Sequence, residues 1–175
     1  MRNLMTKEDL KKDEYNPYYQ QYIQKSGDVT LTEGLKNNGD LTIAFLESIP
    51  EEKLEYRYAE GKWTIKEIIQ HLIDTERVFT YRALCIARGD KTLFPGYDQD
   101  EYAANSEANK RSMFSLMNEY KAVRLASIIM FESFSEAMLK RIGVASNSNL
   151  SPRAVAFIVI GHENHHCEII NERYL

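Results

Sequence analysis

Residues 150–170 read LSPRAVAFIVIGHENHHCEII and contain both a helix start and three of the four histidines of the chain. Ser151 followed by Pro152 is typical of a helix start, because a serine side chain caps free backbone N–H groups and proline suits the first helical position. Leu150 and Val155 stand at the spacing of a hydrophobic staple across that start. The sequence therefore predicts a helix that begins after Ser151 and continues to the end of the chain.

One face of this helix is apolar except for two histidines. The stripe recurs at helical spacing and consists of Val155, Ile158 or Val159, His162, His166, and Ile169 or Ile170. An apolar stripe on a helix faces a protein core. We therefore expect His162 and His166 to point inward, where a polar group without a partner costs about 1–3 kcal/mol.

Three more helices are expected upstream of this one. Periodic apolar residues predict them over residues 30–49, 64–88 and 107–142, with a loop over residues 90–106. Thr64 and Glu67 have the spacing of a capping box at the second helix start. Four long helices joined by loops predict an all-α fold, a four-helix bundle.

The N-terminal residues 1–28 differ from the rest in their aromatic content. They contain a tyrosine cluster, Tyr15, Tyr18, Tyr19 and Tyr22. So many tyrosines are rarely left exposed. We expect residues 1–28 to form an arm packed on a bundle domain of residues 29–175.

Composition excludes several classes of protein. The 175 residues include 22 Lys and Arg and 26 Asp and Glu, a net charge of 22 − 26 = −4, which argues against a nucleic-acid partner. No apolar stretch is long enough to span a bilayer. The first residues lack the apolar core of a signal peptide, and two cysteines make no disulfide framework. A cytoplasmic location without membrane contact is predicted.

A third histidine, His71, lies in the middle of the second predicted helix. If that helix neighbours the last one, its imidazole can join those of His162 and His166, which are one turn apart on one face. Three neutral imidazoles plus water make an open metal site of the catalytic type. The alternative is that the histidines are core residues whose ring nitrogens have hydrogen-bond partners and hold no metal. His165 points about 100° away from His166 and is a poor ligand candidate.

Two carboxylates follow His71 in the sequence, Asp74 and Glu76. Either could orient the His71 imidazole from outside the ligand set or act as a base. The alternative is that they pair with Arg77 and Arg82 on the helix surface, and this is the expectation for Glu76. Glu163 is expected to be solvated or at an interface.

The loop over residues 90–106 is long for a connection between helices, which often indicates a functional role. On that ground alone, Tyr97, Asp98 and Tyr102 are candidate walls of a substrate pocket.

Several motifs together resemble the DinB-like superfamily, which includes YfiT-type metal-dependent hydrolases. They are GKWT at 61–64, HLIDTER at 71–77, YRAL at 81–84, FPGYD at 94–98 and GHENHH at 161–166. The resemblance implies an up-down-down-up bundle, often a homodimer. It also implies a divalent metal, zinc or nickel, on His71, His162 and His166.

Characterised members of that superfamily include S-transferases for the low-molecular-weight thiols bacillithiol, mycothiol and glutathione. The expected function is therefore a metal-dependent hydrolase or thiol S-transferase acting on a small molecule. The first alternative is a non-catalytic metal-binding or stress-response bundle, and the second is an interaction protein that acts through a dimer face.

Overall fold

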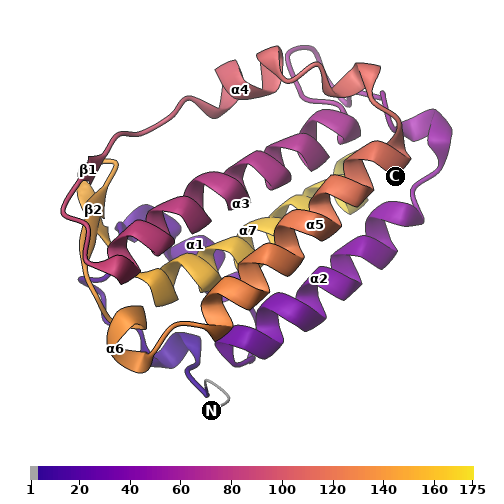
Figure 1. Ribbon diagram of the computed structural model, residues 1–175. Helices are drawn as coiled ribbons and strands as arrows, with labels where there is room; N and C mark the ends of the chain where they lie inside the picture. Colours follow the sequence, from indigo (N-terminus) through magenta and orange to yellow (C-terminus); the bar gives the residue numbers. More distant parts are fainter. Residues whose placement is uncertain (1–3) are drawn as a thin grey trace.

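The computed structural model describes residues 4–175, and four long helices lie side by side within them (Figure 1). They are α2 (Leu31–Glu47), α3 (Ile65–Arg88), α5 (Met113–Glu132) and α7 (Pro152–Arg173). Helices α2 and α3 each contact both α5 and α7. The predicted all-α four-helix bundle is confirmed.

The order of helix directions explains the longest connection. Helices α2 and α7 run one way along the bundle, and α3 and α5 run the other way (Figure 1). Because α3 and α5 are consecutive and parallel, the chain between them has to return along the whole bundle. Residues 89–112 make this return, so the topology itself requires a long segment here.

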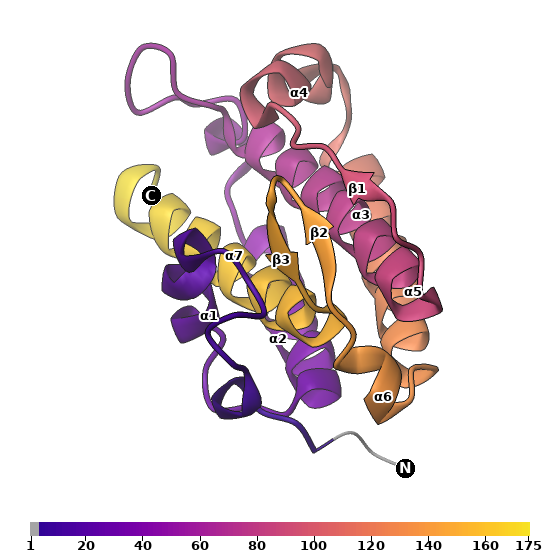
Figure 2. The same cartoon turned by 90° about the vertical axis from the view of Figure 1, so that its left-hand side faces the viewer.

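The crossover contains structure that the sequence did not predict. It holds β1 (Leu93–Phe94) and α4 (Gln99–Asn105). Strand β1 pairs in parallel with β2 (Gly143–Ala145), which pairs antiparallel with β3 (Ser148–Leu150). The three strands lie beside one end of α3 and α7 (Figure 2).

The prediction of one helix over residues 107–142 was wrong. Helix α5 begins only at Met113, where the Ser112 side chain accepts a hydrogen bond from the Ser115 N–H. It ends at Glu132, and a separate short helix, α6 (Glu136–Leu139), follows behind its own cap Ser135. Neither glycine nor proline marks this break. The apolar periodicity continues through it, so the pattern predicted one long helix.

The described residues of the predicted arm, 4–28, pack on α7, and residues 1–3 lie outside the described structure. Helix α1 (Gln20–Lys25) lies alongside α7 (Figure 2). A Cβ on Gly161 would lie 1.6 Å from the carbonyl oxygen of Tyr22, so only glycine permits this approach. Within residues 4–175, four short 3₁₀ helices complete the helical structure: Lys7–Asp9, Pro17–Tyr19, Glu51–Lys53 and Ala108–Lys110.

The first half of α7 is buried on every side. All residues from 152 to 163 are buried, because α1, α2 and α3 surround this part of the helix. A helix enclosed in this way carries apolar residues around its whole circumference, as AVAFIVIG at residues 154–161 does.

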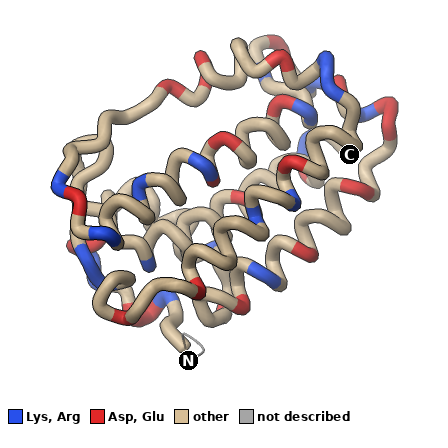
Figure 3. The backbone as a smooth tube through the Cα atoms, in the orientation of Figure 1, with Lys and Arg blue, Asp and Glu red and all other residues tan. Residues whose placement is uncertain are grey.

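Charged residues of both signs alternate along the helices and loops (Figure 3). No helix of residues 4–175 combines the length and the apolar character that a membrane crossing requires.

Candidate metal centre

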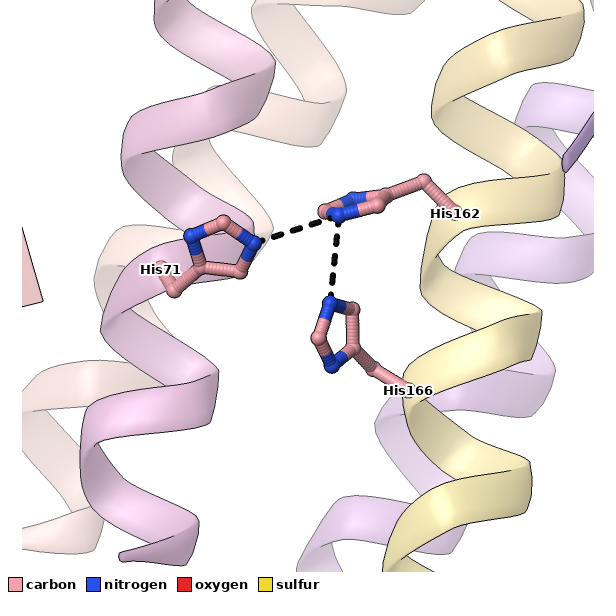
Figure 4. A group of neighbouring side chains, drawn as sticks. All are labelled: His71, His162 and His166. Carbon is pink, nitrogen blue, oxygen red and sulfur yellow. Dashed lines mark hydrogen bonds between the residues drawn. The ribbon is translucent and has the colours of Figure 1, made fainter. Parts of the chain in front are cut away.

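Three histidines from two helices meet inside the bundle (Figure 4). The Nε2 atom of His162 lies 3.1 Å from Nε2 of His71 and 3.1 Å from Nε2 of His166. One potential ligand atom from each residue lies within 4.8 Å of the other two. The sequence placed these three residues in one candidate site, and the structure brings them together.

Helix geometry accounts for this convergence. His162 and His166 are one turn apart on α7, so their rings lie on the same face. His71 lies on α3, which packs directly against α7. His71 and His162 are buried, and His166 is half-buried.

Burial keeps all three imidazoles neutral near pH 7. It lowers the pKa of His71 to about 4 and, helped by the neighbouring histidines, the pKa of His166 to about 3. Burial holds the pKa of His162 well below its usual range, and the nearby His166 and His71 lower it further. A neutral imidazole has the free lone pair that a metal ion requires.

The contacts between the rings fit a shared cation. An imidazole nitrogen carries one hydrogen or one lone pair in the ring plane, so it makes one linear hydrogen bond. Nε2 of His162 has two other ring nitrogens at 3.1 Å, and one linear bond cannot serve both. Ligand nitrogens about 2.05 Å from a tetrahedral zinc ion lie about 3.3 Å apart, which is close to this spacing.

The Nδ1 atom of His71 is connected through Thr75 to the crossover segment, residues 89–112. Thr75 Oγ1 lies 3.4 Å from Nδ1 of His71 and 2.8 Å from the Tyr97 hydroxyl. Thr75 thus connects a candidate ligand to a residue between β1 and α4.

Aromatic rings hold the imidazoles from two sides. The Trp63 ring lies 4.7 Å from His71 and is nearly parallel to His166 at 6.5 Å between centroids. The Tyr22 ring meets His162 edge-on at 5.2 Å and His165 at 5.4 Å. His165 therefore packs beside the cluster, with its ring against Tyr22.

Two cavities adjoin the histidine cluster. The smaller, of about 320 Å³, includes His162 and lies on the Tyr22 side. The larger, of about 640 Å³, includes His165 and His166 and lies on the Trp63 side. Both volumes are within the range of small-molecule sites.

The candidate pocket residues of the crossover have different positions. Tyr97 lines the smaller cavity. Asp98 caps α4 by accepting hydrogen bonds from the backbone N–H groups of Asp100 and Glu101. Tyr102 packs its ring on Tyr97 at 5.0 Å, and neither it nor Asp98 is among the residues that line the two cavities.

Asp74 lies beside Gln70, whose side-chain amide donates a 2.9 Å hydrogen bond to its carboxylate. Burial raises the pKa of Asp74 above its ordinary value. In the described part of the chain, the hydrogen-bond partner of His71 Nδ1 is Thr75, four residues further along α3. The structure thus gives the orienting contact to Thr75 instead of Asp74.

The expectations for Glu76 and Glu163 were wrong, because both carboxylates are buried and share one arginine. Arg124 Nη2 lies 2.8 Å from Glu76 Oε2 and 2.6 Å from Glu163 Oε2. The Tyr120 hydroxyl donates to Glu163 at 2.6 Å, and the Asn38 amide donates to it too.

A signal for this network exists in the sequence. Tyr120, Arg124, Ser127 and Phe131 stand at helical spacing and are all buried on α5. That arrangement marks Arg124 as a core position, whose charge requires a carboxylate from another helix.

Comparison with known proteins identifies the family. The sequence profile described as the DinB superfamily matches residues 35–170. The chain belongs to the DinB superfamily. The three histidines and most of the bundle of this DinB-superfamily protein fall within the matched residues.

Two relatives are similar over most of the chain. The Oceanobacillus iheyensis protein named "Putative metal-dependent hydrolase OB0413" is 26% identical over 125 residues, which cover 68% of this chain and 69% of the relative. YfiT from Bacillus subtilis, described as a probable metal-dependent hydrolase with an unusual four-helix bundle topology, has a TM-score of 0.67. That match covers 93% of this chain and 89% of YfiT at 14% identity, and it supports the shared fold.

Proposed function

We propose that this DinB-superfamily protein is a divalent-metal-dependent enzyme, with His71, His162 and His166 as ligands of one zinc or nickel ion. The observation that carries the proposal is the convergence of three neutral imidazole nitrogens beside two cavities. The descriptions of the two relatives, a "putative metal-dependent hydrolase" and a "probable metal-dependent hydrolase", support the same assignment.

A divalent ion on three imidazoles keeps one position for water or substrate and lowers the pKa of a water or thiol held there. The chain's own residues would supply the rest of the site. Thr75 would fix the orientation of His71, while Trp63 and Tyr22 would hold the rings and exclude water. The two cavities would give a substrate, or two reactants, access to the histidines.

We propose hydrolysis or transfer of a low-molecular-weight thiol as the reaction, with a small molecule as substrate. Hydrolysis needs one organic substrate, whereas thiol transfer needs a thiol and an electrophile together. Separate cavities beside His162 and beside His166 are compatible with either reaction.

The test uses protein loaded with zinc or with nickel, and its His71→Ala variant. Release of p-nitrophenolate from p-nitrophenyl acetate reports hydrolysis, and loss of glutathione in the presence of 1-chloro-2,4-dinitrobenzene reports thiol transfer. We expect metal-dependent turnover in one of the assays that falls at least 100-fold in the variant. A protein that binds metal tightly yet shows no turnover in either assay would favour the non-catalytic bundle.

The homodimer remains a prediction. Small-angle scattering at several protein concentrations tests it, and a mass equal to one chain throughout the series would contradict it.

A further inference from the structure

Arg82 is a buried cation without a carboxylate partner. Its side chain is 4% exposed, and no ion pair to it occurs within residues 4–175. The other two buried arginines of the described chain, Arg124 and Arg153, both have buried glutamates. A buried charge is costly unless it is paired, so Arg82 is the exception that needs a reason.

The guanidinium of Arg82 is held in place but not saturated. One Nη donates a 2.7 Å hydrogen bond to the Pro95 carbonyl oxygen, and the group lies over the rings of Phe79 at 5.3 Å and Tyr97 at 5.8 Å. A guanidinium has five N–H groups in a planar fork. Most of them are therefore free for a ligand, and Arg82 lines the smaller cavity.

The smaller cavity has no negative group to satisfy this charge. Its lining contains no aspartate or glutamate, and Arg82 is its one arginine or lysine. The other polar groups are hydroxyls, a glutamine, glycine backbone and His162: Tyr18, Tyr19, Tyr22, Thr75, Gly96, Tyr97, Gln99, Ser146 and His162. In a chain with a net charge of −4, this is a locally cationic chamber with hydrogen-bond donors around it.

We propose that this cavity binds the carboxylate of an elongated organic anion, with Arg82 as the anchor and the reacting end of the molecule at the histidines. A carboxylate matches the two-pronged guanidinium geometry. The proposal rests on the proposed function for the reacting end, but the anion site itself rests on Arg82 and the cavity.

The length of the ligand follows from helix geometry. His71, Thr75, Phe79 and Arg82 follow one another at three- and four-residue steps along one face of α3. At 1.5 Å per residue, the α-carbons of His71 and Arg82 are about 16 Å apart along the axis, and long helical side chains lean back toward the N-terminus. The carboxylate and the reacting group are therefore separated by several bonds, and the Tyr and Phe rings contact the body between them.

The test compares carboxylic acids with their uncharged amides. Acetate, benzoate and 4-phenylbutyrate, and the three corresponding amides, are titrated into the protein as purified and after zinc loading, with dissociation constants from NMR shifts. We expect 4-phenylbutyrate to bind at least tenfold more tightly than its amide, and acetate to bind more weakly than 4-phenylbutyrate. If none of the three acids binds more than twofold better than its amide, the proposal is overturned.

Variants locate the site. Arg82→Met should reduce the acid preference to less than twofold, and Arg82→Lys should retain part of it. Arg77→Met is the matched control, because Arg77 is on the same helix but is exposed and paired with Glu119; it should keep the full preference. Retention of the tenfold preference in Arg82→Met would contradict the proposal. If that variant does not fold, the acid-to-amide ratio of the wild type decides.

The anion site and the metal site fail independently. Loss of zinc binding in His71→Ala with an unchanged acid preference supports both. Zinc binding without any acid preference removes the anion site alone. An acid preference without zinc binding removes the proposed function and leaves the anion site in place.

Discussion

The Nε2 atom of His71 lies 3.1 Å from that of His162, although 91 residues separate the two in sequence. This contact joins α3 to α7 at the level of the two cavities. Any ion held there would hold the two helices together in the folded state, whereas the unfolded chain offers no preformed site.

Zinc should therefore stabilise the protein. With free zinc at 100 times its dissociation constant, the free energy of unfolding should rise by about 2.7 kcal/mol. Urea unfolding, monitored by circular dichroism with zinc or with a chelator, measures this difference. His162→Ala should abolish it, and an equal gain in that variant would show that zinc binds elsewhere.

Arg124 should be the most sensitive charged residue of the core. Arg124→Met leaves two carboxylates, Glu76 and Glu163, buried without a cation. The expected loss of unfolding free energy is about 3–5 kcal/mol. Lys121 lies on the same helix as Arg124 and forms an exposed pair with Glu47 of α2, so Lys121→Met should cost about 0.5 kcal/mol. Similar losses in the two variants would contradict the importance of the buried network.

Glu14 should make stability depend on acid pH. Burial alone would raise its pKa, but hydrogen bonds from Arg153 and Ser151 outweigh burial and hold the pKa below the ordinary glutamate value of 4.5. A lowered carboxyl pKa stabilises the fold above about pH 4.5, and this contribution is lost as the pH falls through the folded value. Glu14→Gln should cost about 3 kcal/mol at pH 7.

The cost of Glu14→Gln should shrink as the pH falls below 4.5, because the unfolded wild-type chain then binds a proton at Glu14 that folding has to release, and the difference is gone once the folded protein is protonated too. Urea unfolding of both proteins from pH 7 to pH 3 measures this difference directly. A cost that stays constant over the series would mean that the ionised form of Glu14 does not stabilise the folded state more than the protonated form does.

Gly161 should be required for the packing of α1 against α7. An alanine Cβ at this position would overlap the Tyr22 carbonyl oxygen, and backbone cannot move aside as a flexible side chain can. We expect Gly161→Ala to cost about 3 kcal/mol, the upper end for overpacking, and to expose residues 20–30 to trypsin. Gly96→Ala is the control, since its added Cβ meets nothing closer than 3.6 Å. Equal trypsin resistance of both variants would contradict this close approach.

Local patterns were enough for most of the bundle. The capping box at Thr64 and the Ser151-Pro152 start fixed the first residues of α3 and α7 to within one residue. The three histidines were found because two lie on one helical stripe and the third lies mid-helix among apolar residues. Such features depend on residues within one or two turns of each other.

The charge pairs and side-chain hydrogen bonds between separate segments were not predicted. Glu76 was assigned to surface arginines on its own helix because spacing along one helix is all that a sequence shows. Its partner Arg124 comes from α5, and this pairing follows only from the crossover that places α5 beside α3. The contact between Thr75 and Tyr97 has the same origin, because Tyr97 reaches the site from the crossover.

Metal content measures whether three histidines hold one divalent ion. Elemental analysis after zinc or nickel loading and desalting should give one ion per chain for the wild type and for His165→Ala, whose ring lies outside the cluster. His71→Ala, His162→Ala and His166→Ala should each retain less than one tenth of that amount. One ion per chain in all three of these variants, or none in the wild type, would contradict the account.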